Sequence, residues 1–159
     1  MELKEEILPL LERQLAPKLR YRTLLFHCRH MPSIQAIEEA LLGLPEFWPS
    51  SPLRIGQEEM FDSGGALSAQ RLLENIKSVE YQQPIILCGP LHICDCWSHE
   101  SRRVLWQHLA AFSAGPGIAV IDVPREQDTQ GLFRIVGRLS AVDGYYLKSR
   151  LTATEDGLV

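Results

Sequence analysis

Apolar residues along the chain alternate between helical spacing and short continuous runs. The helical spacing, with apolar residues three or four positions apart, predicts helices over residues 2–16, 32–43, 66–79 and 98–112. The continuous runs predict buried strands over residues 22–28, 53–55, 84–88 and 117–123. Because strands and helices alternate, we expect a mainly parallel sheet flanked by helices on both faces.

The last part of the chain follows a different pattern. Residues 132–139 and 145–152 read as two strands joined by a short connection that contains Asp143 and Gly144. An Asp-Gly pair between two strands is a strong hairpin signal. We therefore expect an α/β fold that closes with a C-terminal antiparallel hairpin, built as one domain over residues 1–159.

Local signals refine the expected helices. Pro9 lies inside the first helix, where it is expected to kink the helix or delay its start. Pro32 suits the first turn of the second helix, and Gly43 suits its C-terminal end. Ser98 has the side chain of a residue that caps the start of a helix.

Composition and charge narrow the function classes. The chain has 159 residues, is 45% hydrophobic and carries a net charge of -4. These values favour a folded domain and argue against a strongly basic nucleic-acid-binding protein, although a local basic face stays open. The charged start of the chain does not read as a signal peptide, and no apolar run is long enough to span a membrane. We expect a cytoplasmic protein with reduced cysteines and no membrane contact.

The motifs of common nucleotide-binding and hydrolytic enzymes are missing. The sequence has no G-x-x-x-x-G-K-[ST] loop, no G-x-G-x-x-G after a strand and no G-x-S-x-G elbow. P-loop nucleotide hydrolysis, dinucleotide binding and α/β-hydrolase chemistry therefore lack support. Ser63, Gly64 and Gly65 precede a predicted helix, where they would bind an anion or simply form a turn.

All four cysteines and four of the five histidines fall in residues 27–30 and 88–99. Each segment follows a predicted buried strand, so both would lie at one edge of the sheet if the two strands are neighbours. Tetrahedral zinc prefers thiolate and imidazole ligands, and four candidates lie within eight residues: His92, Cys94, Cys96 and His99. The tight C-x-C spacing differs from that of familiar zinc fingers.

Two other interpretations of the same cluster stay open. Cys28 and Cys88 would be small buried apolar residues within strands, with the histidines as polar loop residues. Alternatively, Cys94 or Cys96 would be a reactive thiol beside a histidine.

Further side chains could complete a site at this edge. His27 and His30 would add imidazoles to a zinc site. Asp95, Glu100 and Asp122 would add carboxylates, and Asp122 is well placed at the end of a strand. The alternative is that Asp122 caps a loop or a helix.

The predicted hairpin carries a basic stripe. With ordinary strand alternation, Arg134 and Arg138 share a face of the first strand, and Lys148 and Arg150 share a face of the second. Such a stripe would track a phosphate backbone. It would equally serve as a solvated sheet face or as a protein interface, where arginine is favoured.

Three segments of the C-terminal third together resemble BrxB-type proteins, small components of BREX phage-defence systems. They are residues 116–124 (PGIAVIDVP), 128–139 (DTQGLFRIVGRL) and 143–151 (DGYYLKSRL). The resemblance implies an α/β, P-loop NTPase-like fold without a working Walker A motif. It also implies an accessory or assembly role, with a PglZ-type phosphatase-like protein among the partners. The Cys/His cluster lies outside the resemblance, which carries over no catalytic residue.

Three functions follow as hypotheses. The leading one is a non-catalytic accessory protein of a bacterial defence system, acting through contacts with other proteins of the same operon. The second is a zinc-binding protein or metal-dependent enzyme that uses His92, Cys94, Cys96 and His99. The third is a nucleic-acid-binding module that uses the hairpin cations. Homo-oligomerisation is compatible with each of them.

Overall fold

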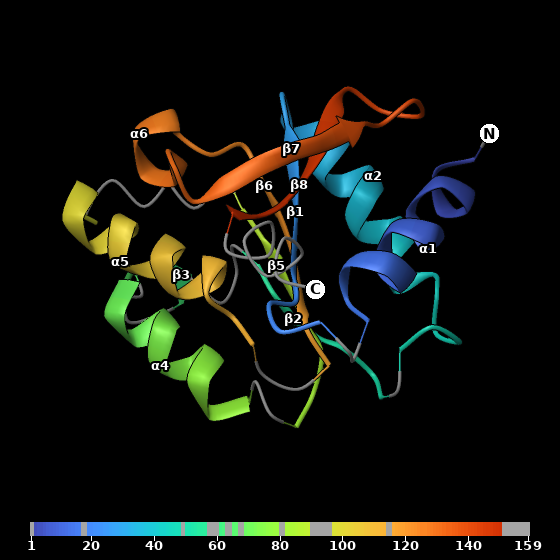
Figure 1. Ribbon diagram of the computed structural model, residues 1–159. Helices are drawn as coiled ribbons and strands as arrows, with labels where there is room; N and C mark the ends of the chain where they lie inside the picture. Colours follow the sequence, from blue (N-terminus) through green and yellow to red (C-terminus); the bar gives the residue numbers. More distant parts are fainter. Residues whose placement is uncertain are drawn as a thin grey trace.

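The computed structural model arranges the elements around one central sheet (Figure 1). It describes residues 2–16, 19–48, 50–56, 61–62, 65–66, 69–79, 82–89, 97–113 and 116–150. Within that part of the chain, no helix combines the length and the apolar character needed to cross a membrane.

The central sheet has six strands in the order β2-β5-β6-β1-β8-β7. Their bounds are β1 (Thr23–Cys28), β2 (Leu53–Ile55), β5 (Ile85–Cys88), β6 (Ile118–Asp122), β7 (Phe133–Arg138) and β8 (Gly144–Ser149). The first four strands in that order are parallel to one another. β8 pairs antiparallel with β1, and β7 pairs antiparallel with β8. The predicted α/β class, mainly parallel sheet and closing antiparallel hairpin are confirmed.

Helices cover both faces of the sheet, as the alternating pattern predicts. Helices α1 (Leu3–Gln14) and α2 (Met31–Leu42) lie on one side in Figure 1, and α4 (Ala69–Val79) and α5 (His99–Ala110) on the other. We call these sides the α1/α2 face and the α4/α5 face. A short helix, α6 (Glu126–Thr129), packs beside α5.

The two faces of the sheet have separate cores. On β1, Leu24 and Phe26 belong to the core under α1 and α2, and Leu25 belongs to the core under α4 and α5. All three are fully buried, as expected where side chains of a strand alternate between two covered faces. This two-sided burial explains why the central strands read as continuous apolar runs.

Several details differ from the sequence predictions. Helix α1 begins at Leu3 and runs through Pro9, so the proline does not delay its start. The sequence pattern did not predict α6 or the two-stranded sheet of β3 (Phe61–Asp62) and β4 (Gly65–Ala66). These elements have only two to four residues each, too few to show a hydrophobic period.

The C-terminal hairpin contains an irregularity that the sequence did not predict. The register between β7 and β8 shifts between Ile135 and Gly137, which indicates a bulge at Val136. Past the bulge, Gly137 lies opposite Tyr146. A Cβ atom at Gly137 would stand 2.4 Å from the Tyr146 hydroxyl oxygen, so glycine leaves the space that this ring occupies.

Candidate functional site at the carboxyl edge of the sheet

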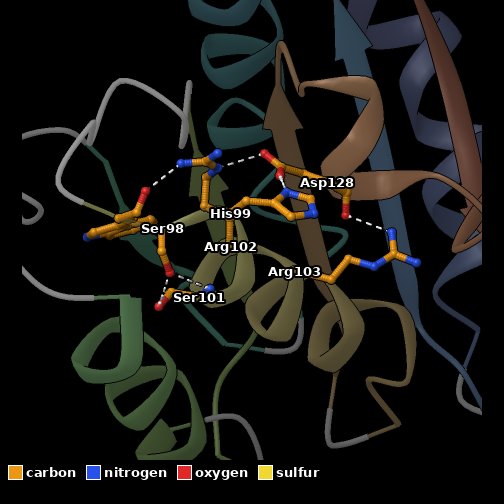
Figure 2. Close-up of polar contacts among 7 residues, drawn as sticks. Ser98, His99, Ser101, Arg102, Arg103 and Asp128 are labelled. Carbon is orange, nitrogen blue, oxygen red and sulfur yellow. Dashed lines mark hydrogen bonds and ion pairs between the residues drawn. The ribbon is translucent and has the colours of Figure 1, made fainter.

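The loops beyond the parallel strands bring polar residues together at one edge of the sheet. β5 is followed by α5, and β6 is followed by α6, so the starts of both helices lie beyond the carboxyl ends of neighbouring strands. In open α/β sheets this edge is where ligands bind. The polar cluster shown in Figure 2 lies between these two helices.

Ser98 fixes the start of α5. Its backbone is extended, and its hydroxyl oxygen accepts a hydrogen bond from the Ser101 backbone N–H at 3.0 Å. The Ser98 hydroxyl also lies 3.0 Å from the Ser101 hydroxyl oxygen (Figure 2). This cap confirms the predicted helix start and sets His99 as the first residue of the helix.

A buried ion pair joins α5 to α6. The Arg102 Nε donates to Asp128 Oδ2 at 2.8 Å, and the side chains are 6% and 1% exposed. Arg102 Nη1 also donates to the Trp97 carbonyl at 2.6 Å. Arg103 Nη1 donates to the backbone carbonyl of Asp128 at 3.1 Å (Figure 2). A buried charge pair needs such additional hydrogen bonds to offset its desolvation cost.

The same carboxylate orients His99. His99 Nδ1 lies 2.9 Å from Asp128 Oδ1, while the His99 side chain is 54% exposed. An ionised carboxylate only accepts hydrogen bonds, so Nδ1 carries the proton in this contact. In the neutral ring, Nε2 is then the nitrogen with the available lone pair. The arrangement can present that nitrogen to a proton or to a metal ion.

The predicted zinc ligands are only partly covered by the structure. His92, Cys94 and Cys96, together with Asp95, lie outside the described residues. His99 is described, and its ring contacts Asp128. Across the described ranges, no group of three or more His, Cys, Asp or Glu side chains is placed to hold a metal ion. The zinc site therefore stays a prediction from the sequence.

β1 and β5 are not direct neighbours, because β6 lies between them, but both pair in parallel with β6, so their carboxyl ends lie at the same edge of the sheet. Cys28 and Cys88 end these two strands, are buried, and are free cysteines. The interpretation of both as small buried side chains is confirmed. Burial, reinforced by the negative charges of Asp122 and Asp143, raises the pKa of Cys28 to about 12. This thiol is protonated at neutral pH and is a poor nucleophile.

A second cluster of polar residues lies where β1 pairs with β6 and β8. His27 is in register with Asp122 on one side and with Tyr145 on the other. Desolvation, together with the nearby Arg29 charge, lowers the pKa of His27. Asp122 is 1% exposed, and its Oδ1 accepts the Val123 backbone N–H at 2.7 Å, as the loop-capping interpretation expects.

Arg29 adds a cation to this cluster. Its guanidinium lies 3.4 Å from the Tyr145 hydroxyl oxygen and 3.5 Å from an Asp143 carboxylate oxygen. The Tyr145 hydrogen bond and the Asp143 charge raise the pKa of Arg29. His30 lies at the start of α2, where its Nδ1 is 3.2 Å from the Ser33 hydroxyl.

The predicted basic stripe does not lie on one face. Directly paired residues of antiparallel strands point to the same face. Arg134 pairs with Lys148, and Arg138 pairs with Tyr145. Lys148 and Tyr145 are three residues apart on β8, so they point to opposite faces, and so do the two arginines. The shared face predicted for Arg134 and Arg138 is therefore wrong, because the bulge at Val136 reverses the alternation.

The outer strand β7 carries an apolar pair that the sequence analysis did not single out. Ile135 is 62% exposed and Val136 is 37% exposed. β7 ends the strand order of the central sheet. Large apolar side chains on an outer strand are typical of interaction surfaces. We call residues Arg134–Arg138 the β7 surface.

Sequence reasoning also missed Arg102 and Arg103, and it gave Asp128 no role. The three-residue spacing from His99 to Arg102 was an available signal, because it places both side chains on one side of a helix. Asp128 is 26 residues from Arg102, and no periodic pattern connects them.

The chain matches no protein-family model, no curated protein and no solved structure.

Proposed function

We propose that this chain is a non-catalytic accessory protein of a bacterial anti-phage defence system of the BREX type. It works by binding another protein of the same operon through the β7 surface. The observation that carries the proposal is the exposure of Ile135 and Val136 on the outer strand of the sheet. Leaving two neighbouring apolar side chains in contact with water is unfavourable in free energy, and a partner surface that covers them removes this penalty.

Two further observations support this proposal. The sequence lacks the phosphate-binding loop that nucleotide hydrolysis needs, and the mainly parallel sheet with helices on both faces is compatible with the proposed P-loop-like fold. In addition, β7 lies within one of the BrxB-like segments, residues 128–139. A degenerate P-loop-like protein with a PglZ-type partner is the proposal that these observations favour.

Complex formation tests the proposal. The chain is co-expressed with a PglZ-type protein, the proposed partner, and any complex is sized by light scattering after gel filtration. Ile135→Asp should remove the complex, because it places a charge in an apolar contact. Val104→Asp is the matched control, because Val104 is 50% exposed on α5 and lies outside the β7 surface.

Two results would count against this function. One is a complex that forms equally well with Ile135→Asp and wild type. The other is hydrolysis of nucleotide or nucleic acid by the purified chain alone.

Zinc binding is a second candidate, favoured by the contact between Asp128 and His99. A carboxylate on one ring nitrogen is the usual partner of a metal-ligating histidine, and it leaves Nε2 for the metal. His92, Cys94 and Cys96 would supply the other ligands. Elemental analysis of protein purified without chelators or metal-affinity resin tests this candidate. One zinc per chain, lost in His99→Gln, would support it, and substoichiometric zinc would remove it.

A further inference from the structure

The β7 surface places cations on both sides of its apolar pair. Arg134 precedes Ile135 and Val136, and Arg138 follows them after Gly137. Arg138 is exposed, and Arg134 is partly exposed. Lys148 lies opposite Arg134 on β8. Strands β7 (FRIVGR) and β8 (GYYLKS) contain no carboxylate, although the whole chain carries a net charge of -4. Electrostatic complementarity therefore favours an acidic partner at this strand.

The division of the cations between two faces distinguishes a protein partner from a nucleic acid. Arg134 points to the α1/α2 face, because its partner Lys148 is in register with Leu24 of that core. Arg138 points to the α4/α5 face, as its partner Tyr145 does. An extended peptide beside β7 alternates its side chains between the same two faces, so it can offer a carboxylate to each arginine. A phosphate backbone has no apolar group for Ile135 and Val136.

A second copy of this chain fits the surface less well. Two β7 strands brought edge to edge would place two copies of the same cationic strand beside each other. Like charges and a bulge on an outer strand are features that oppose edge-to-edge pairing of identical chains. The same charges become favourable when the incoming segment is acidic.

We propose that the β7 surface binds an extended acidic segment of a partner protein, in which carboxylates lie on both sides of apolar residues. This inference rests on the proposed function, because it names the partner chemistry of the same surface. The apolar pair supplies the contact, and the arginines select the partner by charge.

A peptide-display selection tests the proposal with the full chain. Random peptides are selected on wild-type protein and, in parallel, on Ile135→Asp. Peptides enriched only on wild type should be rich in Asp and Glu beside apolar residues. For a synthetic copy of the best peptide, Arg138→Glu should weaken binding by about tenfold, which corresponds to about 1.4 kcal/mol. Lys77→Glu is the matched control, because Lys77 is an exposed cation on α4, and it should leave binding unchanged.

The other outcomes separate this inference from the proposed function. Peptides without an acidic bias that still require Ile135 would overturn the inference and leave the binding surface in place. Enriched peptides that bind Ile135→Asp equally well, or no enriched peptides, would overturn both. If the chain binds a mixed-sequence DNA duplex more tightly than the best peptide, and Arg138→Glu removes this binding, the ligand of the surface is nucleic acid and not an acidic segment. If the wild-type chain forms a dimer that Ile135→Asp dissociates, the occupant of the surface is a second copy of the chain.

Discussion

At the scale of single residues, burial and long-range contacts decide which side chains are available to react or to bind. Cys28 reads in the sequence as a small buried side chain, and in the fold it is fully buried, with its pKa raised to about 12. Asp128 attracts little attention in the sequence, yet it holds Arg102 and His99 together. Residue type and neighbours along the chain predicted which groups could react, but burial and long-range contacts determined which of them are positioned to do so.

Gly137 should tolerate no larger residue while Tyr146 keeps its ring in place. In Gly137→Ala the new Cβ atom would stand 2.4 Å from the Tyr146 hydroxyl oxygen and 2.6 Å from the ring carbon that bears it. We expect a loss of about 1–3 kcal/mol in the free energy of unfolding, measured by denaturant titration. Most of this loss should disappear when Gly137→Ala is compared with wild type in a Tyr146→Ala background. Equal losses in both backgrounds would contradict this explanation.

The stability of the protein should depend on the charge of His27. Its pKa is lower in the folded chain than its ordinary value of 6.5, so the unfolded chain binds this proton more readily. The stabilisation is therefore present above pH 6.5 and is lost as the pH falls through the folded pKa. Unfolding free energies measured between pH 5 and pH 8 should fall less steeply toward acid in His27→Gln than in wild type. Identical slopes would contradict the prediction.

At the scale of elements, the sequence predicted the larger units and their layers but not the order of the strands in the sheet. Strands such as Ile118–Asp122 are buried on both faces, and this leaves a continuous apolar run that is easy to detect. The position of β6 between β1 and β5 leaves no such trace, because neighbours in a parallel sheet are set by tertiary packing. The bulge at Val136 was also missed, and one added residue was enough to separate Arg134 from Arg138.

The contact between α5 and α6 should depend on the buried ion pair. Arg102→Ala leaves the Asp128 carboxylate buried without its main cation, and we expect a loss of about 3–5 kcal/mol in unfolding free energy. Replacing both residues with apolar ones, Arg102→Met with Asp128→Leu, should recover most of this loss. Denaturant titration of the single and double variants provides the measurement. A single variant within about 0.5 kcal/mol of wild type would show that the pair is not structural.

At the scale of the whole molecule, one sheet serves two purposes. Its parallel part is covered on both sides by helices and forms the cores. Its antiparallel end leaves β7 on the outside, with Ile135 and Val136 exposed. The sequence pointed to this hairpin through its cations. It could not show the exposed apolar pair, because exposure depends on β7 being the outermost strand.

Amide hydrogen exchange tests the proposed interface most directly. Exchange is measured for the chain alone and in the presence of a PglZ-type protein, the proposed partner. We predict slower exchange on binding in residues 133–138 of β7, where the partner would cover the outer strand. Unchanged exchange in β7, with protection confined to helices α4 and α5, would contradict the account.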